Sequence, residues 1–329
     1  MQFRTTIDIK PFEQRIDHTQ PILSLGSCFA NNIAERLAEA KFQIVASPTG
    51  ILFNPESIAA ALNRFDALSR GDKGAIPSAE ELSHSGSRWF SFDFHSDFSC
   101  SQADKALALM QQGVERGARA LSNAKVVIIT FGTAFVYRHK CSGEVVANCH
   151  KQPQSLFLRE MLSANEIATQ YISLLQGPLS DKQVKFTISP VRHLSDGLED
   201  NSLSKAILRL AIETIKRSCH NAIYFPAYEI MMDELRDYRF YAEDMTHPSV
   251  VAVDYIWQRF AESAFSPQTL KANQQIERIV KATHHRPFDA QSNEHKAFCR
   301  TMIEKCELIE QQYRPIKMTE EKEFFNTYL

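Results

Sequence analysis

The sequence lacks long apolar stretches and long runs of like charge. Its 37 basic and 39 acidic residues give a formal net charge of -2, and neither sign is gathered into a block. Because nucleic acids and anionic membranes attract basic patches, we expect neither as a partner. No stretch approaches the ~18 consecutive apolar residues of a membrane-spanning helix. The first residues also lack a basic segment followed by an apolar one, so a cytoplasmic protein is expected.

Cysteine is sparse and scattered. The seven cysteines are Cys28, Cys100, Cys141, Cys149, Cys219, Cys299 and Cys306. Their number is odd and no C-x-x-C pair occurs, which predicts free thiols rather than a disulfide framework. A zinc site needs two closely spaced half-sites of Cys and His, and the adjacent pairs Cys149-His150 and Cys219-His220 each lack a second half. We therefore expect no metal.

Short apolar runs recur along the first 225 residues. Residues 125–131 form a continuous β-branched run, which is typical of a central parallel strand that is covered on both faces. Further strands are expected at residues 21–26, 42–46, 184–189 and 222–225. Amphipathic helical segments separate these runs. Strands that alternate with helices predict an α/β fold with a parallel, doubly wound sheet.

The periodicity also predicts where the helices lie and where the sheet domain ends. Helices are expected at residues 29–37, 55–68, 102–121, 158–175, 202–217, 250–264, 267–282 and 293–312. Two insertions, residues 87–99 and 135–150, carry short β-like pieces. No strand pattern follows residue 249. We therefore predict a sheet domain over residues 1–265 and a helical C-terminal extension over residues 266–329.

A serine follows the first predicted strand. In open parallel sheets, ligands bind outside the carboxyl ends of the strands. Gly26 permits a sharp turn there, and Ser27 stands at the start of a helix, whose amides stabilise negative charge. Ser27 is therefore a candidate nucleophile. A helix N-cap is the other role that a serine takes at such a position.

An Asp-x-x-His pair, Asp244 and His247, follows the last predicted strand. An aspartate three residues before a histidine can accept the ring Nδ1–H and leave Nε2 to act as a general base. The same two residues can also be an N-cap and a buried histidine. Because Ser27 follows the first strand, we expect all three at one edge of the sheet, as a Ser-His-Asp set.

Residues 26–30 read Gly-Ser-Cys-Phe-Ala, and through this motif the chain resembles the GSCFA family. Further stretches that match the family lie at residues 50–55, 132–137, 148–151, 189–193 and 244–248. The family in turn resembles the SGNH hydrolases of the GDSL type. That resemblance implies a flavodoxin-like, three-layer α/β/α sandwich with a central parallel sheet.

The resemblance also implies roles for single residues. It places the nucleophile at Ser27 and the Asp-His pair at Asp244 and His247. The first block of these hydrolases is Gly-Asp-Ser, so an alignment anchored on Gly26 places the nucleophile at Cys28 instead. A thiol near a helix N-terminus and a histidine can form a thiolate.

An oxyanion hole is implied as well. In these hydrolases it combines the nucleophile's amide, a glycine amide after the second strand and an asparagine after the third. Gly50 matches the glycine, but no asparagine follows the third strand, so the Thr133 hydroxyl or the Asn148 amide is expected to replace it. Arg192 and His193 follow the fourth strand, where a cation can bind an anionic part of a substrate.

The implied activity is ester hydrolysis or acyl transfer through an acyl-enzyme on Ser27, without a cofactor. The expected substrate is a short-chain acyl ester, for example an acetylated carbohydrate or another small metabolite. Two alternatives stay open. One is a binding or interaction protein that keeps the scaffold without catalysis, and the other is a thiol-dependent acyltransferase that uses Cys28.

Overall fold

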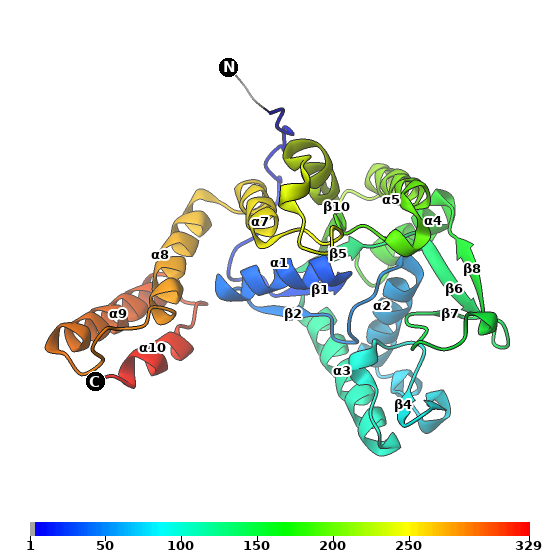
Figure 1. The fold of residues 1–329 in the computed structure, drawn as a ribbon, viewed down its shortest axis with the longest axis horizontal. Helices are drawn as coiled ribbons and strands as arrows, with labels where there is room; N and C mark the ends of the chain where they lie inside the picture. Colours follow the sequence, from blue (N-terminus) through cyan, green and yellow to red (C-terminus); the bar gives the residue numbers. More distant parts are fainter. Residues whose placement is uncertain (1–3) are drawn as a thin grey trace.

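A computed structural model describes residues 4–329, with the side chain of residue 196 left out. Its centre is a sheet of five parallel strands (Figure 1). They are β1 (Ile22–Gly26), β2 (Ile44–Ala46), β5 (Val126–Phe131), β9 (Gln183–Ile188) and β10 (Ala222–Phe225). Their spatial order is β10-β9-β5-β1-β2, which is the flavodoxin-like doubly wound order. The predicted parallel α/β sheet is confirmed.

Helices cover both faces of this sheet. The first layer consists of α2 (Pro55–Ser69), α3 (Ala103–Asn123), α4 (Ala164–Gln176) and α5 (Leu198–Ser218). The second layer consists of α1 (Cys28–Glu39), α7 (Val250–Ala264), the short α6 (Ala227–Glu229) and the π-helical η6 (Ile230–Leu235). Neighbouring strand residues point to opposite layers. Leu23 packs with the first layer and Ile22 with the second, as the two-residue period of a strand requires. The three-layer sandwich is therefore as predicted.

Helix starts follow the capping signals in the sequence. Asn54 accepts a hydrogen bond from the Ser57 amide, and Pro55 takes the first position of α2. Ser163 and Glu166 form a capping box at the start of α4. These side chains satisfy amides that have no partner inside the helix, and so they fix where each helix begins.

The predicted helix over residues 158–175 is wrong in its first part. Residues 157–161 form strand β8 (Phe157–Met161), which pairs antiparallel with β6 (Phe135–His139) beside β7 (Val145–Val146). The capping box at Ser163 delays the helix until residue 164. A two-stranded hairpin, β3 (Ser83–Ser85) with β4 (Arg88–Phe90), forms the other insertion.

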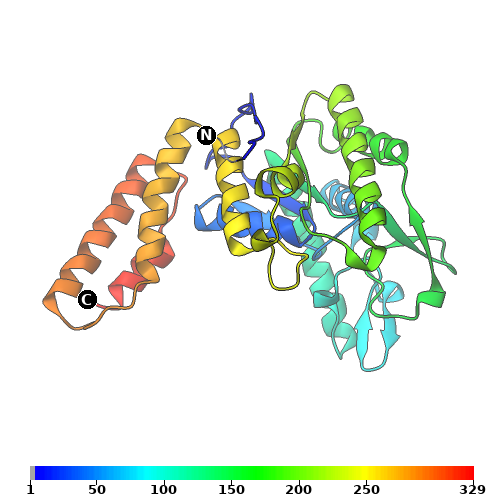
Figure 2. The ribbon, with the colours of Figure 1, turned by 45° about the horizontal axis from the view of Figure 1, so that its top comes forward.

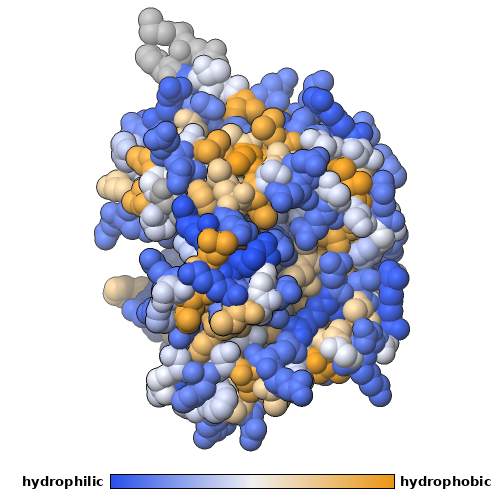
Figure 3. Space-filling view, turned by 90° about the vertical axis from the view of Figure 1, so that its right-hand side faces the viewer, coloured by the Kyte–Doolittle hydropathy of each residue, from blue (hydrophilic) through white to orange (hydrophobic). Residues whose placement is uncertain are grey.

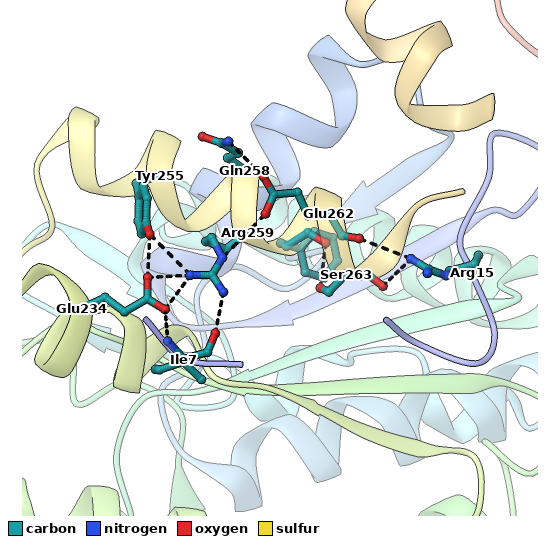
Figure 4. A network of polar contacts seen from close by, with 9 residues as sticks. Ile7, Arg15, Glu234, Tyr255, Gln258, Arg259, Glu262 and Ser263 are labelled. Carbon is teal, nitrogen blue, oxygen red and sulfur yellow. Dashed lines mark hydrogen bonds and ion pairs between the residues drawn. The ribbon is translucent and has the colours of Figure 1, made fainter. Parts of the chain in front are cut away.

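An N-terminal strap, residues 7–16, fastens onto α7 and η6 (Figure 4). Its anchor is a buried ion pair between Arg259 and Glu234, whose nearest atoms lie 2.6 Å apart. The Ile7 amide donates to Glu234 and the Ile7 carbonyl accepts from Arg259, both at 2.6 Å. Tyr255 donates its hydroxyl to the same carboxylate at 2.6 Å. A buried carboxylate needs such a set of donors to offset its desolvation.

The C-terminal helices form a core of their own. They are α8 (Pro267–Thr283), α9 (Asn293–Gln312) and α10 (Thr319–Asn326), and they stand to one side of the sheet domain (Figure 2). Sequence periodicity missed the short α10. An ion pair of 2.6 Å between Lys41, just after α1, and Glu321 of α10 joins them to the domain. No helix within residues 4–329 has the length and apolar character to cross a membrane.

On the opposite side of the molecule, α5 carries exposed apolar side chains. Figure 3 shows hydrophobic patches among hydrophilic residues on this face. Leu198, Leu203 and Leu210 of α5 are each about half exposed or more. Leu203 and Leu210 are seven residues apart and so lie on the same face of the helix. The outer surface of this layer is therefore partly apolar.

Candidate active site

Ser27 stands at the carboxyl end of β1, where the chain turns into α1. Gly26 has a φ of +141°, and a Cβ atom on it would lie 2.2 Å from the Thr130 carbonyl oxygen. Only glycine fits this turn. Ser27 is 1% exposed, makes no side-chain cap bond, and has no hydrogen-bond partner for Oγ among the described residues. The hydrogen bond of an N-cap, which is the alternative role for Ser27, is thus absent among the described residues. The Ser27 hydroxyl therefore has no structural role there that a hydrogen bond would show.

Gly132, at the end of β5, lies against Ser27. A Cβ on Gly132 would be 3.4 Å from the Ser27 Cβ and 2.8 Å from the Phe53 carbonyl oxygen. That carbonyl accepts the amides of Gly132 and Thr133, at 2.8 and 3.0 Å. The chain leaves β1 and β5 in opposite directions, to the two helical layers. Ser27 and Gly132 therefore mark the topological switch point, where doubly wound sheets bind ligands.

Asp244 and His247 form the expected pair. Asp244 Oδ2 lies 2.6 Å from His247 Nδ1, and Oδ1 accepts the amides of Thr246 and His247, each at 2.9 Å. These backbone donors, together with the imidazole, hold the Asp244 pKa well below its usual range. The side chain of His247 is 48% exposed. The carboxylate thus orients the ring through Nδ1.

The 244–247 turn is tied to the segment after β9. The Arg192 amide donates to the Thr246 carbonyl at 3.1 Å. The Asp244 charge raises the pKa of the Cys28 thiol, and His247 lowers the pKa of the His193 ring, so the members of each pair lie close enough to interact electrostatically. The structure therefore brings Ser27, Asp244 and His247 to one edge of the sheet.

His193 differs from the expected rim cation. Burial, the Lys205 charge and the nearby His247 lower its pKa to about 4, against a smaller opposing hydrogen bond with the Gly132 backbone. The ring is therefore neutral at pH 7. Its Nε2 is buried and, within residues 4–329, without a hydrogen-bond partner.

Lys205 of α5 is a component that the sequence prediction missed. It is 2% exposed, and its Nζ donates to the carbonyl oxygens of Gly132 and Ser189, at 2.6 and 2.8 Å. These carbonyls follow β5 and β9. Lys205 precedes the buried Leu208 and Ile212 by three and seven residues, so its place on the apolar face of the helix was the available signal.

The expected oxyanion donors take part in hydrogen bonds within the protein. The Gly50 amide donates to the Ser47 carbonyl at 2.8 Å, and the Ser27 amide donates to the Thr130 carbonyl at 3.1 Å. Both amides are engaged. The Thr133 hydroxyl accepts the Phe135 amide at 3.1 Å and lies 3.1 Å from the Ser204 hydroxyl. These bonds shape the turn after β5, and the two amides are left without a free N–H for an oxyanion.

Asn148 and Arg192 also have partners of their own. Asn148 Oδ1 accepts the His150 amide at 2.8 Å, which closes a local turn after β7. Arg192 Nε donates to the Tyr241 hydroxyl at 2.9 Å, and its guanidinium carbon lies 4.0 Å from the centre of that ring. Arg192, Tyr238 and Tyr241 line a cavity of about 300 Å³. Arg192 thus lies at a cavity, with its guanidinium held by tyrosine side chains.

Cys28, the alternative nucleophile, is partly buried at the start of α1. Burial raises the pKa of its thiol, and the Asp244 charge raises it further; the amides of Phe29 and Cys28 and the Lys205 charge oppose this without reversing it. A thiolate is the reactive form of cysteine. The structure therefore favours the unreactive thiol at neutral pH.

The comparisons with known proteins agree with the motif. The sequence profile of the GSCFA family matches residues 21–260. A second profile, described as the C-terminal domain of GSCFA domain proteins, matches residues 276–329. A search of curated proteins returned no match. Because the first profile covers most of the sequence, the chain belongs to the GSCFA family.

Proposed function

We propose that this protein is an ester hydrolase or acyltransferase of the SGNH type, acting on a short-chain acyl ester of a carbohydrate or another small metabolite. The observation that carries the proposal is the unpartnered Ser27 hydroxyl at the switch point of the sheet. The Asp244–His247 pair on the same edge supports it. Together they are the groups that an activated serine requires.

The reaction runs through an acyl-enzyme. Ser27 Oγ attacks the acyl carbon while its proton passes to His247 Nε2, and Asp244 stabilises the imidazolium that forms. The bond to the alcohol then breaks, and the alcohol leaves with the proton from His247. Water gives hydrolysis and a second alcohol gives transfer, each losing its proton to His247 as it attacks the acyl carbon. The bond between that carbon and Ser27 Oγ then breaks, and His247 returns the proton to Ser27.

Access to the serine requires a movement. The Ser27 hydroxyl oxygen exposes less than 1 Å², so side chains above it must shift before an acyl group reaches it. His247 is already half exposed. Substrate binding is therefore coupled to opening of the site, which is a common way for enzymes to exclude water until the substrate is bound.

A non-catalytic binding protein is the second candidate. It is favoured by one observation, namely that the amides of Ser27 and Gly50 both donate to backbone carbonyls. An oxyanion hole needs donors that are free to meet the developing charge. A thiol-dependent acyltransferase has less support, because the Cys28 pKa is raised.

The deciding experiment measures hydrolysis of p-nitrophenyl acetate and butyrate, and acetate release from acetylated sugars. The proteins compared are the wild type, Ser27→Ala, Cys28→Ala and the control Ser24→Ala, which removes another buried serine hydroxyl, from the strand that Ser27 follows. Thermal unfolding checks that each is folded. Loss of turnover with Ser27→Ala alone supports the proposal, and loss with Cys28→Ala alone identifies the thiol. No turnover by the wild type, or equal turnover by all four, favours the binding protein.

A further inference from the structure

Two buried polar atoms beside Gly132 have no hydrogen-bond partner among the described residues. They are Ser27 Oγ and His193 Nε2. Buried polar atoms are nearly always paired, because an unpaired one costs about 1–3 kcal/mol. Two such atoms at the switch point of one sheet therefore indicate a place prepared for polar atoms of a ligand.

Gly132 and Phe53 connect the two side chains. A Cβ on Gly132 would lie 3.4 Å from the Ser27 Cβ, and the Gly132 backbone lies close enough to the His193 ring to affect its pKa. The rings of Phe53 and His193 meet edge to face, with centres 6.1 Å apart. Because the Phe53 carbonyl also accepts the Gly132 amide, His193 and Ser27 border the same short turn.

The electrostatic surroundings keep this imidazole neutral. Burial lowers its pKa first, and the charge of Lys205 and the nearby His247 lower it further, to about 4. A neutral imidazole carries one N–H and holds it throughout the range of an ordinary assay. Such a ring can donate a hydrogen bond to a developing negative charge without giving up its proton.

We propose that His193 donates its Nε2–H to the acyl carbonyl oxygen as Ser27 attacks, and thus supplies the oxyanion donor that the backbone amides do not. This inference rests on the function proposed above. As the bond from Ser27 Oγ to the acyl carbon forms, the carbonyl π pair moves onto oxygen, and His193 holds that oxygen while keeping its proton. His247 receives the serine proton. Lys205, bonded to the Gly132 carbonyl, adds positive charge nearby.

Paired amide substitutions test which ring nitrogen matters. Glutamine places an amide near the position of Nε2, whereas asparagine places one near Nδ1. We expect His193→Asn to lower kcat for p-nitrophenyl acetate by about 10²- to 10³-fold with little change in KM, as expected for an oxyanion donor. His193→Gln should retain at least tenfold more activity than His193→Asn. The pH at which kcat falls on the acid side of its pH profile should be the same in both variants and the wild type, because His247 remains the base.

His18→Gln is the matched control for loss of a buried neutral histidine. Burial lowers the pKa of His18, but its Nε2 already has a partner, the Ala40 carbonyl at 2.9 Å. Ala40 follows α1, whose 12 residues make it about 18 Å long, so this histidine bonds to the end of the helix away from Ser27. The control should change stability and leave kcat as in the wild type.

A second measurement does not depend on turnover. Nitrogen-15 spectra of histidine-labelled protein, with His193→Asn to assign the signal, report which ring nitrogen carries the proton at pH 7. The proposal requires a proton on Nε2. A proton on Nδ1 alone overturns it whatever the assay gives.

The remaining outcomes are also decisive. Equal activities of the two His193 variants, or loss of the acid limb with them, overturn the donor role while ester hydrolysis stands. If the wild type hydrolyses no ester, the proposed function fails and the oxyanion role fails with it. The nitrogen-15 spectra then still establish whether His193 presents an N–H from Nε2.

Discussion

Lys205 Nζ lies 2.6 Å from the carbonyl oxygen of Gly132, and it also holds the Ser189 carbonyl at 2.8 Å. One buried ammonium thus joins the ends of β5 and β9. Since Gly132 packs against Ser27, the bonds of Lys205 set the backbone position beside the candidate nucleophile.

Replacing Lys205 by methionine should destabilise the protein by about 3 kcal/mol. The substitution leaves two buried carbonyls without their charged donor, while the apolar chain fills much of the same space. Urea unfolding at pH 7 measures the effect. Lys216→Met, which removes a surface ion pair with Glu213, should change the stability by less than about 0.5 kcal/mol. Equal effects of the two substitutions would contradict a special role for the buried amine.

Asp244→Asn should lower ester turnover by about 10³- to 10⁴-fold and leave the protein folded. An amide oxygen can still accept the Thr246 and His247 amides, but the imidazole loses the carboxylate that fixes its tautomer and stabilises its charge. Steady-state kinetics and circular dichroism check this. Asp254→Asn, on the exposed side of α7, should have the turnover of the wild type. A loss below tenfold would remove Asp244 from the proposed triad.

Stability should depend on pH through His193. Its pKa is lowered to about 4 in the folded state from 6.5, so the unfolded chain binds this proton more readily between these values. The contribution of the neutral His193 ring to the free energy of unfolding is complete above pH 6.5 and is lost as the pH falls toward 4. Between pH 7 and pH 5 the loss amounts to about 2 kcal/mol.

Urea unfolding of the wild type and His193→Gln at both pH values isolates this contribution. His18 and His150, whose pKa values are also lowered by burial, titrate in both proteins and cancel. The wild type should lose about 2 kcal/mol more than the variant on acidification. Parallel pH dependences would show that the ring titrates normally.

Gly26→Ala should destabilise the fold by more than about 4 kcal/mol. The added Cβ would meet the Thr130 carbonyl oxygen at 2.2 Å, in a backbone conformation that alanine rarely adopts. Gly71→Ala is the control, because its φ of +93° is also unfavourable but no atom lies within 4 Å of the added Cβ. It should cost about 1–2 kcal/mol. Thermal and urea unfolding compare the two, and equal losses would assign the whole effect to backbone strain.

Arg259→Met should release the N-terminal strap. The Glu234 carboxylate, with a fully buried side chain, would lose its cation, at a cost of about 3–5 kcal/mol. Trypsin should then cleave sooner after Arg15, since Lys10 precedes a proline and is not a cleavage site. Arg217→Met, which removes a surface arginine that pairs with Glu213, serves as the control. An unchanged digestion rate at the strap would show that its other contacts suffice to hold it.

Much of the sheet and its edge could be predicted from the sequence because the signals are local. Buried strands such as residues 126–131 are continuous β-branched runs, and Asn54-Pro55 marks a helix start by itself. Strand β8 was mistaken for a helix because its partner, β6, lies about 20 residues earlier and periodicity does not show such pairing.

The positions of the candidate site residues were more predictable than their hydrogen bonds. Ser27, Asp244 and His247 were placed at one edge by their positions after strands. The amide of Gly50, in contrast, is engaged by the turn at Ser47, and residue types do not reveal such a bond. The same holds for His193, whose neutrality depends on burial and on a lysine from a later helix.

The strap has a consequence for how the chain folds during synthesis. The Ile7 carbonyl binds Arg259, which lies 252 residues later. At about 5–20 residues per second, a ribosome needs roughly 13–50 seconds to make that partner. The strap therefore lacks its contacts to α7 until that helix emerges, and its closure onto α7 is a late event that marks completion of the sheet domain.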